Sequence, residues 1–173
     1  MNYKQKLNNI KHFVFDIDGV LTDGIISVNS EGLESRNFNT KDGIVIKYAI
    51  KCGYKILIIS GASNNGLKLR LNKLGIKDIF LGSNNKLEDL KTFISNYNLD
   101  SKQILYMGDD VSDFSAMEIV GLKCCPYDAA SEIREISDYI SLKKGGDGCV
   151  RDIIEQTLKV QPVSYTHLTL PTI

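Results

Sequence analysis

Short apolar runs alternate along the chain with longer segments in which apolar residues recur every three or four positions. The short runs have the length of strands and are rich in branched side chains. Buried parallel strands are typically continuous apolar stretches separated by helix-length crossovers, so the spacing predicts a parallel sheet. The predicted strands are residues 12–15, 55–59, 79–81, 104–107, 122–125 and 139–140.

The segments between these runs have the period of amphipathic helices. The clearest are 41–52 and 64–74, each followed by a glycine of the kind that ends helices, and 86–97. We therefore predict an α/β fold with a Rossmann-like parallel sheet flanked by helices. Right-handed crossovers would bring the carboxyl ends of all strands to one edge, where open α/β sheets bind ligands.

One stretch after the first strand breaks this rhythm. Residues 24–38 form two β-rich arms around Asn29-Ser30-Glu31-Gly32, which predicts a small β-hairpin insertion instead of a crossover helix. Because the hairpin leaves the sheet beside the end of the first strand, we expect it to stand over the ligand-binding edge. We therefore favour a role for the hairpin as a lid or an oligomer contact over a hairpin without a function.

The size of the chain predicts a single domain at residues 1–159. The segment 160–173 differs in composition: it holds two of the three prolines and no Lys, Arg, Asp or Glu. We expect it to be a disordered or non-native tail.

Net charge and cysteine usage narrow the class of protein. Lys plus Arg and Asp plus Glu both total 21, so no basic excess indicates nucleic-acid or membrane binding. No apolar run approaches the roughly 20 residues of a membrane-spanning helix, and the polar start has no signal-peptide core. We expect a cytoplasmic protein, with its four cysteines reduced because they show no CxxC spacing.

Acidic residues gather where two predicted strands end. Asp16 and Asp18 follow the first strand, and Asp109, Asp110 and Asp113 follow the fourth. Unit charges about 4 Å apart repel by roughly 4 kcal/mol at an effective dielectric of about 20, so a shared cation is needed to hold them together. Oxygen ligands with no motif histidine favour Mg²⁺ over zinc or a calcium cage.

The spacing of Asp16 and Asp18 suits phosphoryl transfer. Asp16 can attack phosphorus, while Asp18 protonates the departing alkoxide and later activates water against the aspartyl phosphate. Ser60 and the amide of Gly61, at the end of the second strand, can hold phosphoryl oxygens, and Lys86 can offset their charge.

Four segments resemble the motifs of the haloacid dehalogenase superfamily of phosphohydrolases: "DIDGVLTDG", "IISG", "NKL" and "GDDVSD", in that order within residues 11–158. Within the superfamily the chain looks most like the KDO-8-phosphate phosphatases of lipopolysaccharide synthesis, which act on 3-deoxy-D-manno-octulosonate 8-phosphate. "FNTKDG" at 38–43 and the glycine-rich "GGDGCVRD" at 145–152 support this resemblance.

The resemblance implies a role for each matching residue. Asp16 would be the nucleophile and Asp18 the acid and base; Mg²⁺ would be held by Asp16, the Asp18 carbonyl and Asp109. Asp110 and Asp113 would support the site. The side chains toward the substrate would be Lys41, Asp42, Arg70 and Arg151. The resemblance also implies a homotetramer in which hairpins form a central barrel and a neighbouring subunit covers the site.

The chain departs from this family pattern at two positions. Ala62 stands where an arginine usually follows the second motif, and Val45 where a second glycine is usual. An arginine would pair with a sugar-acid carboxylate, so a nonulosonate 9-phosphate phosphatase is the runner-up.

A phospho-receiver signalling module is an alternative of another class, because it shares the sheet, the clustered aspartates, Mg²⁺ and a lysine. Its accepting aspartate normally lacks a second acid two residues on, so Asp18 favours turnover. A silent scaffold is disfavoured because Asp16, Asp18, Lys86 and Asp109 are all present.

Overall fold

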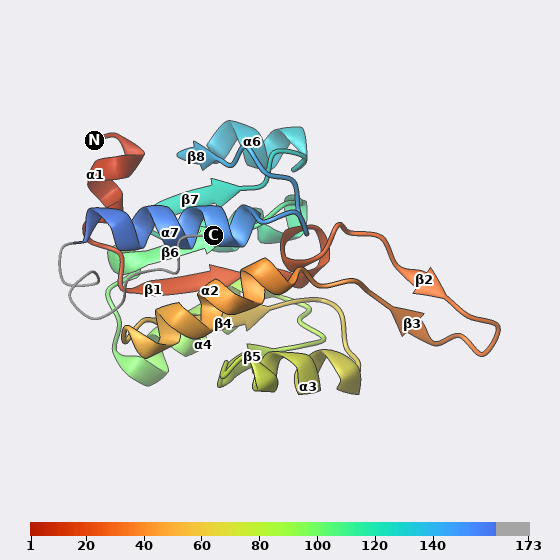
Figure 1. The fold of residues 1–173 in the computed structure, drawn as a ribbon. Coiled ribbons are helices and arrows are strands. Elements are labelled where there is room, and N and C mark those ends of the chain that lie inside the picture. Colours follow the sequence, from red (N-terminus) through yellow and green to blue (C-terminus); the bar gives the residue numbers. More distant parts are fainter. Residues whose placement is uncertain (162–173) are drawn as a thin grey trace.

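A computed structural model describes residues 1–161 of the chain, and in them the predicted parallel sheet is confirmed. Six strands lie in the order β5-β4-β1-β6-β7-β8 (Figure 1). They are β1 (His12–Phe15), β4 (Lys55–Ile59), β5 (Asp78–Phe80), β6 (Ile104–Met107), β7 (Leu122–Cys125) and β8 (Tyr139–Ile140). Only β5 differs from its predicted range, and it differs by one residue.

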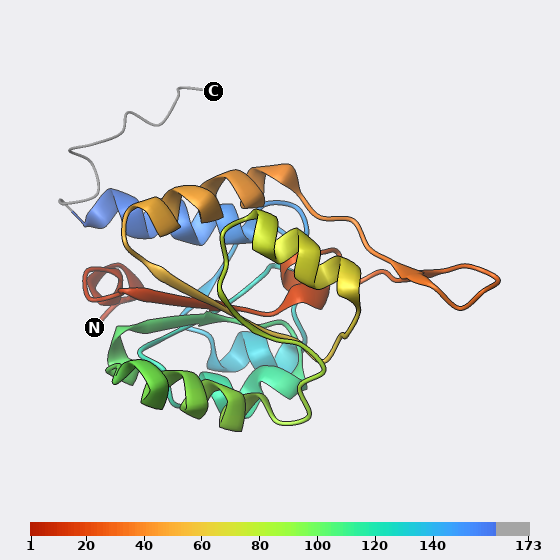
Figure 2. The same ribbon diagram turned by 90° about the horizontal axis from the view of Figure 1, so that it is seen from below.

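Alternate residues of the strands face two separate cores, because successive side chains of a strand point to opposite faces of the sheet. Phe13 and Phe15 pack in one core, whereas Val14 between them packs in the other. Helices α2 (Thr40–Lys51), α3 (Asn65–Lys73) and α7 (Cys149–Val160) cover the first face, and α4 (Lys86–Tyr97), α5 (Phe114–Met117) and α6 (Ser131–Ile136) cover the second (Figure 2).

Asparagine caps fix where the three predicted helices begin. Asn39, Asn64 and Asn85 each accept a hydrogen bond from a backbone N–H of the first turn of α2, α3 and α4. The observed bounds lie within one residue of the predicted ones. The short α1 (Tyr3–Leu7) and the helices α5, α6 and α7 were not predicted.

The strand order places a topological switch point between β1 and β6. From β1 the chain proceeds to β4 and β5 on one side, and returns to β6, β7 and β8 on the other. The loops that follow β1 and β6 therefore diverge at a crevice at the carboxyl edge, where doubly wound sheets bind ligands. These are the loops that carry the clustered aspartates.

The predicted hairpin is present as β2 (Ser27–Val28) and β3 (Glu34–Ser35), joined in antiparallel register. It projects away from the body of the molecule beyond the carboxyl edge (Figures 1 and 2). The sequence had predicted a hairpin that stands over this edge. Ile25, Val28 and Leu33 on it are 67%, 62% and 63% exposed. These three apolar side chains are therefore exposed to solvent and are not buried in the core of their own subunit.

The last described residues belong to the folded body. Val160 ends α7, and the Gln161 side chain donates hydrogen bonds of 2.7 Å to the carbonyls of Leu7 and Ile10. The expected tail at 160–173 therefore begins two residues later at the earliest, because those bonds tie Gln161 to α1 and the following turn. Residues 162–173 lie outside the described part.

Two further features bear on the class of protein. All four cysteines are free thiols. Among residues 1–161, no helix combines the length and apolar character that crossing a membrane requires.

Candidate active site

The loop after β1 is shaped by a glycine that touches the loop after β6. Gly19 has a φ of +86°, which side-chain-bearing residues rarely adopt, and a Cβ there would lie 1.9 Å from Oδ2 of Asp109. Asp16, at the end of β1, accepts a 2.7 Å hydrogen bond from the Ile17 amide at the start of the turn Ile17–Leu21. The glycine thereby lets two acidic loops meet.

Three carboxylates and one ammonium form the centre of this edge. Asp16, Asp109 and Asp113 each place a carboxylate oxygen within 4.8 Å of the others. Lys86, the first residue of α4, bridges two of them: its Nζ lies 2.9 Å from Oδ2 of Asp16 and 2.7 Å from Oδ1 of Asp113. The sequence expectation that distant acids converge with Lys86 agrees with this geometry.

Asp113 anchors the cluster. Its fully buried side chain accepts hydrogen bonds from Lys86, from the Tyr106 hydroxyl at 2.8 Å and from the Asp109 amide at 3.1 Å. The Tyr106 contact was not predicted, although a tyrosine inside a buried strand signals a need for a polar partner. Asp113 thus fixes Lys86 beside Asp16.

The cluster holds more negative charge than its lysine neutralises. Burial, and then Asp113, raise the pKa of Asp16 to about 6, and burial, Asp16 and Asp113 raise the pKa of Asp109 to about 8. Burial alone would lower the pKa of Lys86, but Asp113 and Asp16 outweigh it and raise that pKa. Asp16 and Asp109 therefore bind protons more readily than ordinary carboxyl groups, and a further cation beside them would oppose this.

The donors of the cluster suit a hard divalent cation. All are oxygens, and Oδ1 of Asp109 is buried without a hydrogen-bond partner. Magnesium prefers carboxylate oxygens and needs only one or two of them, so these residues fit Mg²⁺.

Asp18 lies outside the cluster of three carboxylates and is paired with a residue that was not predicted. Arg36, at the base of the hairpin, donates from Nε to Oδ1 at 2.7 Å and from Nη2 to Oδ2 at 3.2 Å. The Asp18 side chain is 28% exposed, whereas that of Arg36 is only 3% exposed. No local sequence pattern signals this pair, because the two residues meet only through the path of the hairpin.

The expected phosphate-binding residues stand at the end of β4, the strand next to β1. Ser60 is buried, its amide donates to the Phe80 carbonyl, and its Oγ accepts from the Ala62 amide at 3.1 Å. Gly61 is exposed at the same edge. Asp110 caps the next turn by accepting from the Val111 amide at 2.7 Å, and its carboxylate is not part of the cluster.

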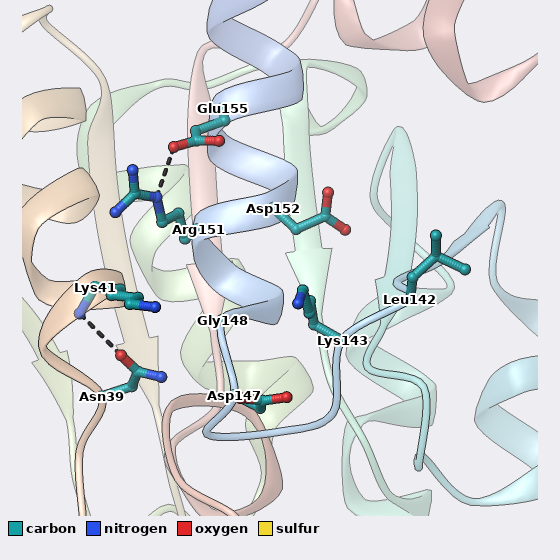
Figure 3. Close-up of a pocket in the computed structure, with 9 residues that line it drawn as sticks. All are labelled: Asn39, Lys41, Leu142, Lys143, Asp147, Gly148, Arg151, Asp152 and Glu155. Atoms are coloured by element: carbon teal, nitrogen blue, oxygen red, sulfur yellow. Dashed lines mark hydrogen bonds and ion pairs between the residues drawn. The ribbon is translucent and has the colours of Figure 1, made fainter. Parts of the chain in front are cut away.

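Two of the residues expected to face substrate line a cavity of about 470 Å³ around the start of α7 (Figure 3). Lys41 lies on one side of it, and the Arg151 side chain runs along α7 to pair with Glu155 at 2.6 Å. Asp42 is buried and accepts from the Arg151 amide at 2.8 Å, which caps α7. Burial raises the pKa of Asp42 to about 6.

Arg70 lines a different cavity, of about 490 Å³, together with Arg36 and Phe38. It passes close to Gly43, where an added Cβ would lie 3.0 Å from its Nη2. The expected substrate residues therefore divide between two cavities.

Comparison with known proteins places these motifs in a family. Residues 72–153 match the family model of haloacid dehalogenase-like hydrolases. The chain is 33% identical over 156 residues to the 3-deoxy-D-manno-octulosonate 8-phosphate phosphatase KdsC of Escherichia coli K12. The match covers 90% of this chain and 83% of that enzyme.

Solved structures agree with this sequence similarity. A Moraxella catarrhalis 3-deoxy-D-manno-octulosonate 8-phosphate phosphatase, in complex with magnesium, phosphate and KDO, has a TM-score of 0.89 and 35% identity over 93% of this chain and 92% of its own. The cobalt-bound Haemophilus influenzae enzyme has a TM-score of 0.89 and 31% identity over 95% and 96% of the two chains. The chain therefore belongs to the 3-deoxy-D-manno-octulosonate 8-phosphate phosphatase family of haloacid dehalogenase-like hydrolases.

Proposed function

We propose that the protein is a Mg²⁺-dependent phosphomonoesterase that hydrolyses 3-deoxy-D-manno-octulosonate 8-phosphate through an aspartyl phosphate. The observation that carries the proposal is the convergence of Asp16, Asp109 and Asp113 around Lys86 at the switch point of the sheet. The family assignment supports it, since the relatives from E. coli and M. catarrhalis bear the name of this activity.

Magnesium would be held by carboxylates of Asp16 and Asp109 and by the backbone carbonyl of Asp18. Bound there, the ion neutralises the carboxylates and polarises the phosphoryl group of the substrate. The unpartnered Oδ1 of Asp109 and the raised pKa values of Asp16 and Asp109 support this assignment, as does the magnesium in the M. catarrhalis relative.

In the first step, an oxygen of Asp16 attacks phosphorus and the ester bond to the sugar breaks. Asp18 gives its proton to the departing alkoxide, which leaves as the sugar-acid alcohol. Lys86 holds Asp16 in place through its 2.9 Å contact and offsets charge on the transferring group. Ser60 and Gly61 bind the other phosphoryl oxygens.

In the second step, Asp18, now a carboxylate, takes a proton from water while the water oxygen attacks phosphorus. The bond between phosphorus and Asp16 breaks, which releases inorganic phosphate and restores the Asp16 carboxylate and the protonated Asp18. A receiver module would preserve its phosphoryl group, so this second acid separates a phosphatase from a signalling protein.

A nonulosonate 9-phosphate is the second candidate substrate. Ala62 stands where the octulosonate enzymes usually carry an arginine, and Val45 where they carry a glycine, so the pocket for the sugar differs from the usual one. Hydrolysis of an eight-carbon and a nine-carbon ulosonate phosphate, compared side by side with Mg²⁺, decides between them. A higher kcat/KM for the nine-carbon ester would replace the first candidate.

The protein acts in this proposal as a cytoplasmic homotetramer in lipopolysaccharide synthesis. Its four free cysteines suit a reducing compartment. Its hairpin projects from the body of the molecule, and Ile25, Val28 and Leu33 on it are exposed, which suits burial against other copies. Light scattering of the purified protein tests the assembly, and a monomer at micromolar concentration would refute it.

The direct test of the activity uses matched substrates and one variant. With Mg²⁺ the protein should hydrolyse the ulosonate phosphate and, less efficiently, an aryl phosphate, and chelation by EDTA should abolish both activities. Asp16→Asn should abolish both as well. Unchanged turnover in that variant would remove Asp16 as the nucleophile.

A further inference from the structure

Arg36 connects the hairpin to the acid and base of the proposed reaction. It follows β3 directly, and its guanidinium pairs with both oxygens of Asp18 and, through Nη2 at 3.0 Å, with Glu34. Only 3% of the side chain is exposed, although the hairpin around it is open to solvent. The sequence motifs assigned no role to this residue.

The guanidinium of Arg36 has a donor that no group of the described chain satisfies. Its Nη1 is buried and lacks a hydrogen-bond partner, and so does Nε of Arg70. Both arginines line the cavity of about 490 Å³ that also borders Phe38 and Thr40. Both donor atoms are covered by protein in this structure. Because buried donors without partners are costly, each would gain a partner by turning into the cavity toward an anionic or hydroxyl-rich ligand.

The position of Asp18 identifies which part of the substrate enters this cavity. The acid that protonates the leaving group must lie beside the leaving-group oxygen, so Arg36 lies on the sugar side of the scissile bond. A guanidinium pairs best with a carboxylate, and the proposed substrate carries one on that leaving group. Arg36 and Arg70 are the two arginines that line this cavity, and Arg36 is the one that contacts Asp18.

The ion pair between Arg36 and Asp18 also prevents Asp18 from acting as the acid in the proposed reaction. Both carboxylate oxygens of Asp18 are bonded to Arg36, and one of them must be free to reach the leaving-group oxygen. Asp18 therefore has to part from Arg36 in each turnover, and a second carboxylate arriving in the cavity gives the guanidinium an alternative acceptor.

We propose that Arg36 is a specificity-determining residue: it binds the carboxylate of the ulosonate leaving group and releases Asp18 as it does so. This inference rests on the proposed function. It makes recognition of the sugar acid a condition for freeing the catalytic acid, so phosphate esters without a carboxylate gain less from Arg36.

Three variants and two esters test the proposal: Arg36→Gln, Arg36→Lys, and Arg134→Gln as a matched control at an exposed arginine outside both cavities. For the octulosonate phosphate, Arg36→Gln should lower kcat/KM about 10- to 100-fold more than for an aryl phosphate, mainly through KM. Arg36→Lys keeps the charge but not the bidentate geometry, and should recover part of that difference. The control should keep the wild-type ratio.

A binding measurement supplies a readout that does not depend on turnover. By calorimetry with Mg²⁺ present, the free sugar acid should bind Arg36→Gln at least about tenfold more weakly than wild type. Equal losses on both esters in Arg36→Gln and Arg36→Lys, with unchanged sugar-acid affinity, would reduce Arg36 to a structural support of the hairpin and overturn the proposal. A wild-type enzyme that does not prefer the ulosonate ester would instead overturn the proposed function, and the inference with it.

Discussion

The acid cluster and the hairpin differ in almost every physical respect. The cluster lies at the ends of buried parallel strands, and Asp113 and Lys86 fix the carboxylates through several short contacts. The hairpin has two paired positions, projects into solvent and exposes its apolar side chains. Yet its base contributes Arg36 to the same site. The groups that break bonds thus lie on the sheet scaffold, and the group that we propose selects the substrate comes from the exposed hairpin.

The largest effect is expected on the rigid side, at the nucleophile. Asp16→Asn should lower kcat by about 10⁴-fold or more, because an amide cannot form the aspartyl phosphate. The metal-free variant at pH 8 should be at least as stable as wild type, because the substitution removes a carboxylate whose pKa burial raises to about 6. Steady-state kinetics and thermal unfolding measure both changes. Lower stability together with lost activity would mean that Asp16 mainly supports the fold.

A slightly smaller effect is expected at the lysine that joins the carboxylates. Lys86→Met leaves Asp16 and Asp113 buried without their shared cation and should destabilise the protein by about 3–5 kcal/mol. Lys91→Met is the matched control, because Lys91 pairs with Glu88 on an exposed face of the same helix. That substitution should cost about 0.5 kcal/mol or less. Denaturant unfolding of both variants tests the contrast, and similar costs would contradict the account of the cluster.

The pH dependence of stability should largely disappear when magnesium binds. The pKa values of Asp16 and Asp109 lie at about 6 and about 8 in the folded protein, above the ordinary value, so the native metal-free state holds more protons than the unfolded chain. Stability of EDTA-treated protein should therefore fall as pH rises from about 5 to 8. Magnesium binds the ionised carboxylates, so its stabilisation should grow over the same range, to about 2.7 kcal/mol at 100 times Kd. Melting temperatures that rise with pH without metal would contradict this.

The smallest effect on folding is expected on the hairpin. Val28→Ser with Leu33→Ser changes side chains that are 62% and 63% exposed, so the stability of each subunit should change by about 0.5 kcal/mol or less. The assembly should nevertheless dissociate, because those side chains form its proposed contacts. Light scattering and thermal unfolding separate the two results. A large loss of subunit stability without dissociation would place the side chains in the subunit core.

The strands were predictable because a buried parallel strand leaves a continuous apolar run. The capped helices α2 and α4 were predictable because the period of their apolar residues is clear. Helix α7 was not predicted, although Val150, Ile153, Ile154 and Leu158 recur at helical spacing. The glycine-rich segment at its start was interpreted only as a family motif.

At the site, sequence reasoning found the residues that follow strand ends and missed the partners that arrive from elsewhere. Asp16, Asp109 and Lys86 follow from topology, since parallel strands bring their carboxyl ends together. The pairing of Asp18 with Arg36 depends on the path of the hairpin, which no local pattern encodes. The burial of Asp42 as a cap for α7 depends on packing between helices that are more than a hundred residues apart in the chain.

Trapping the phosphoenzyme tests the central claim most directly. Asp18→Asn, incubated with Mg²⁺ and the ulosonate phosphate and quenched in acid, should form the phosphoenzyme more slowly, because the amide cannot protonate the departing alkoxide. It should then retain up to one phosphoryl group per subunit, because the amide cannot activate water to remove it. Peptide mapping by mass spectrometry should locate that group on Asp16. A phosphoryl group on another residue, or release of one equivalent of sugar acid with Asp16 unmodified, would contradict the account.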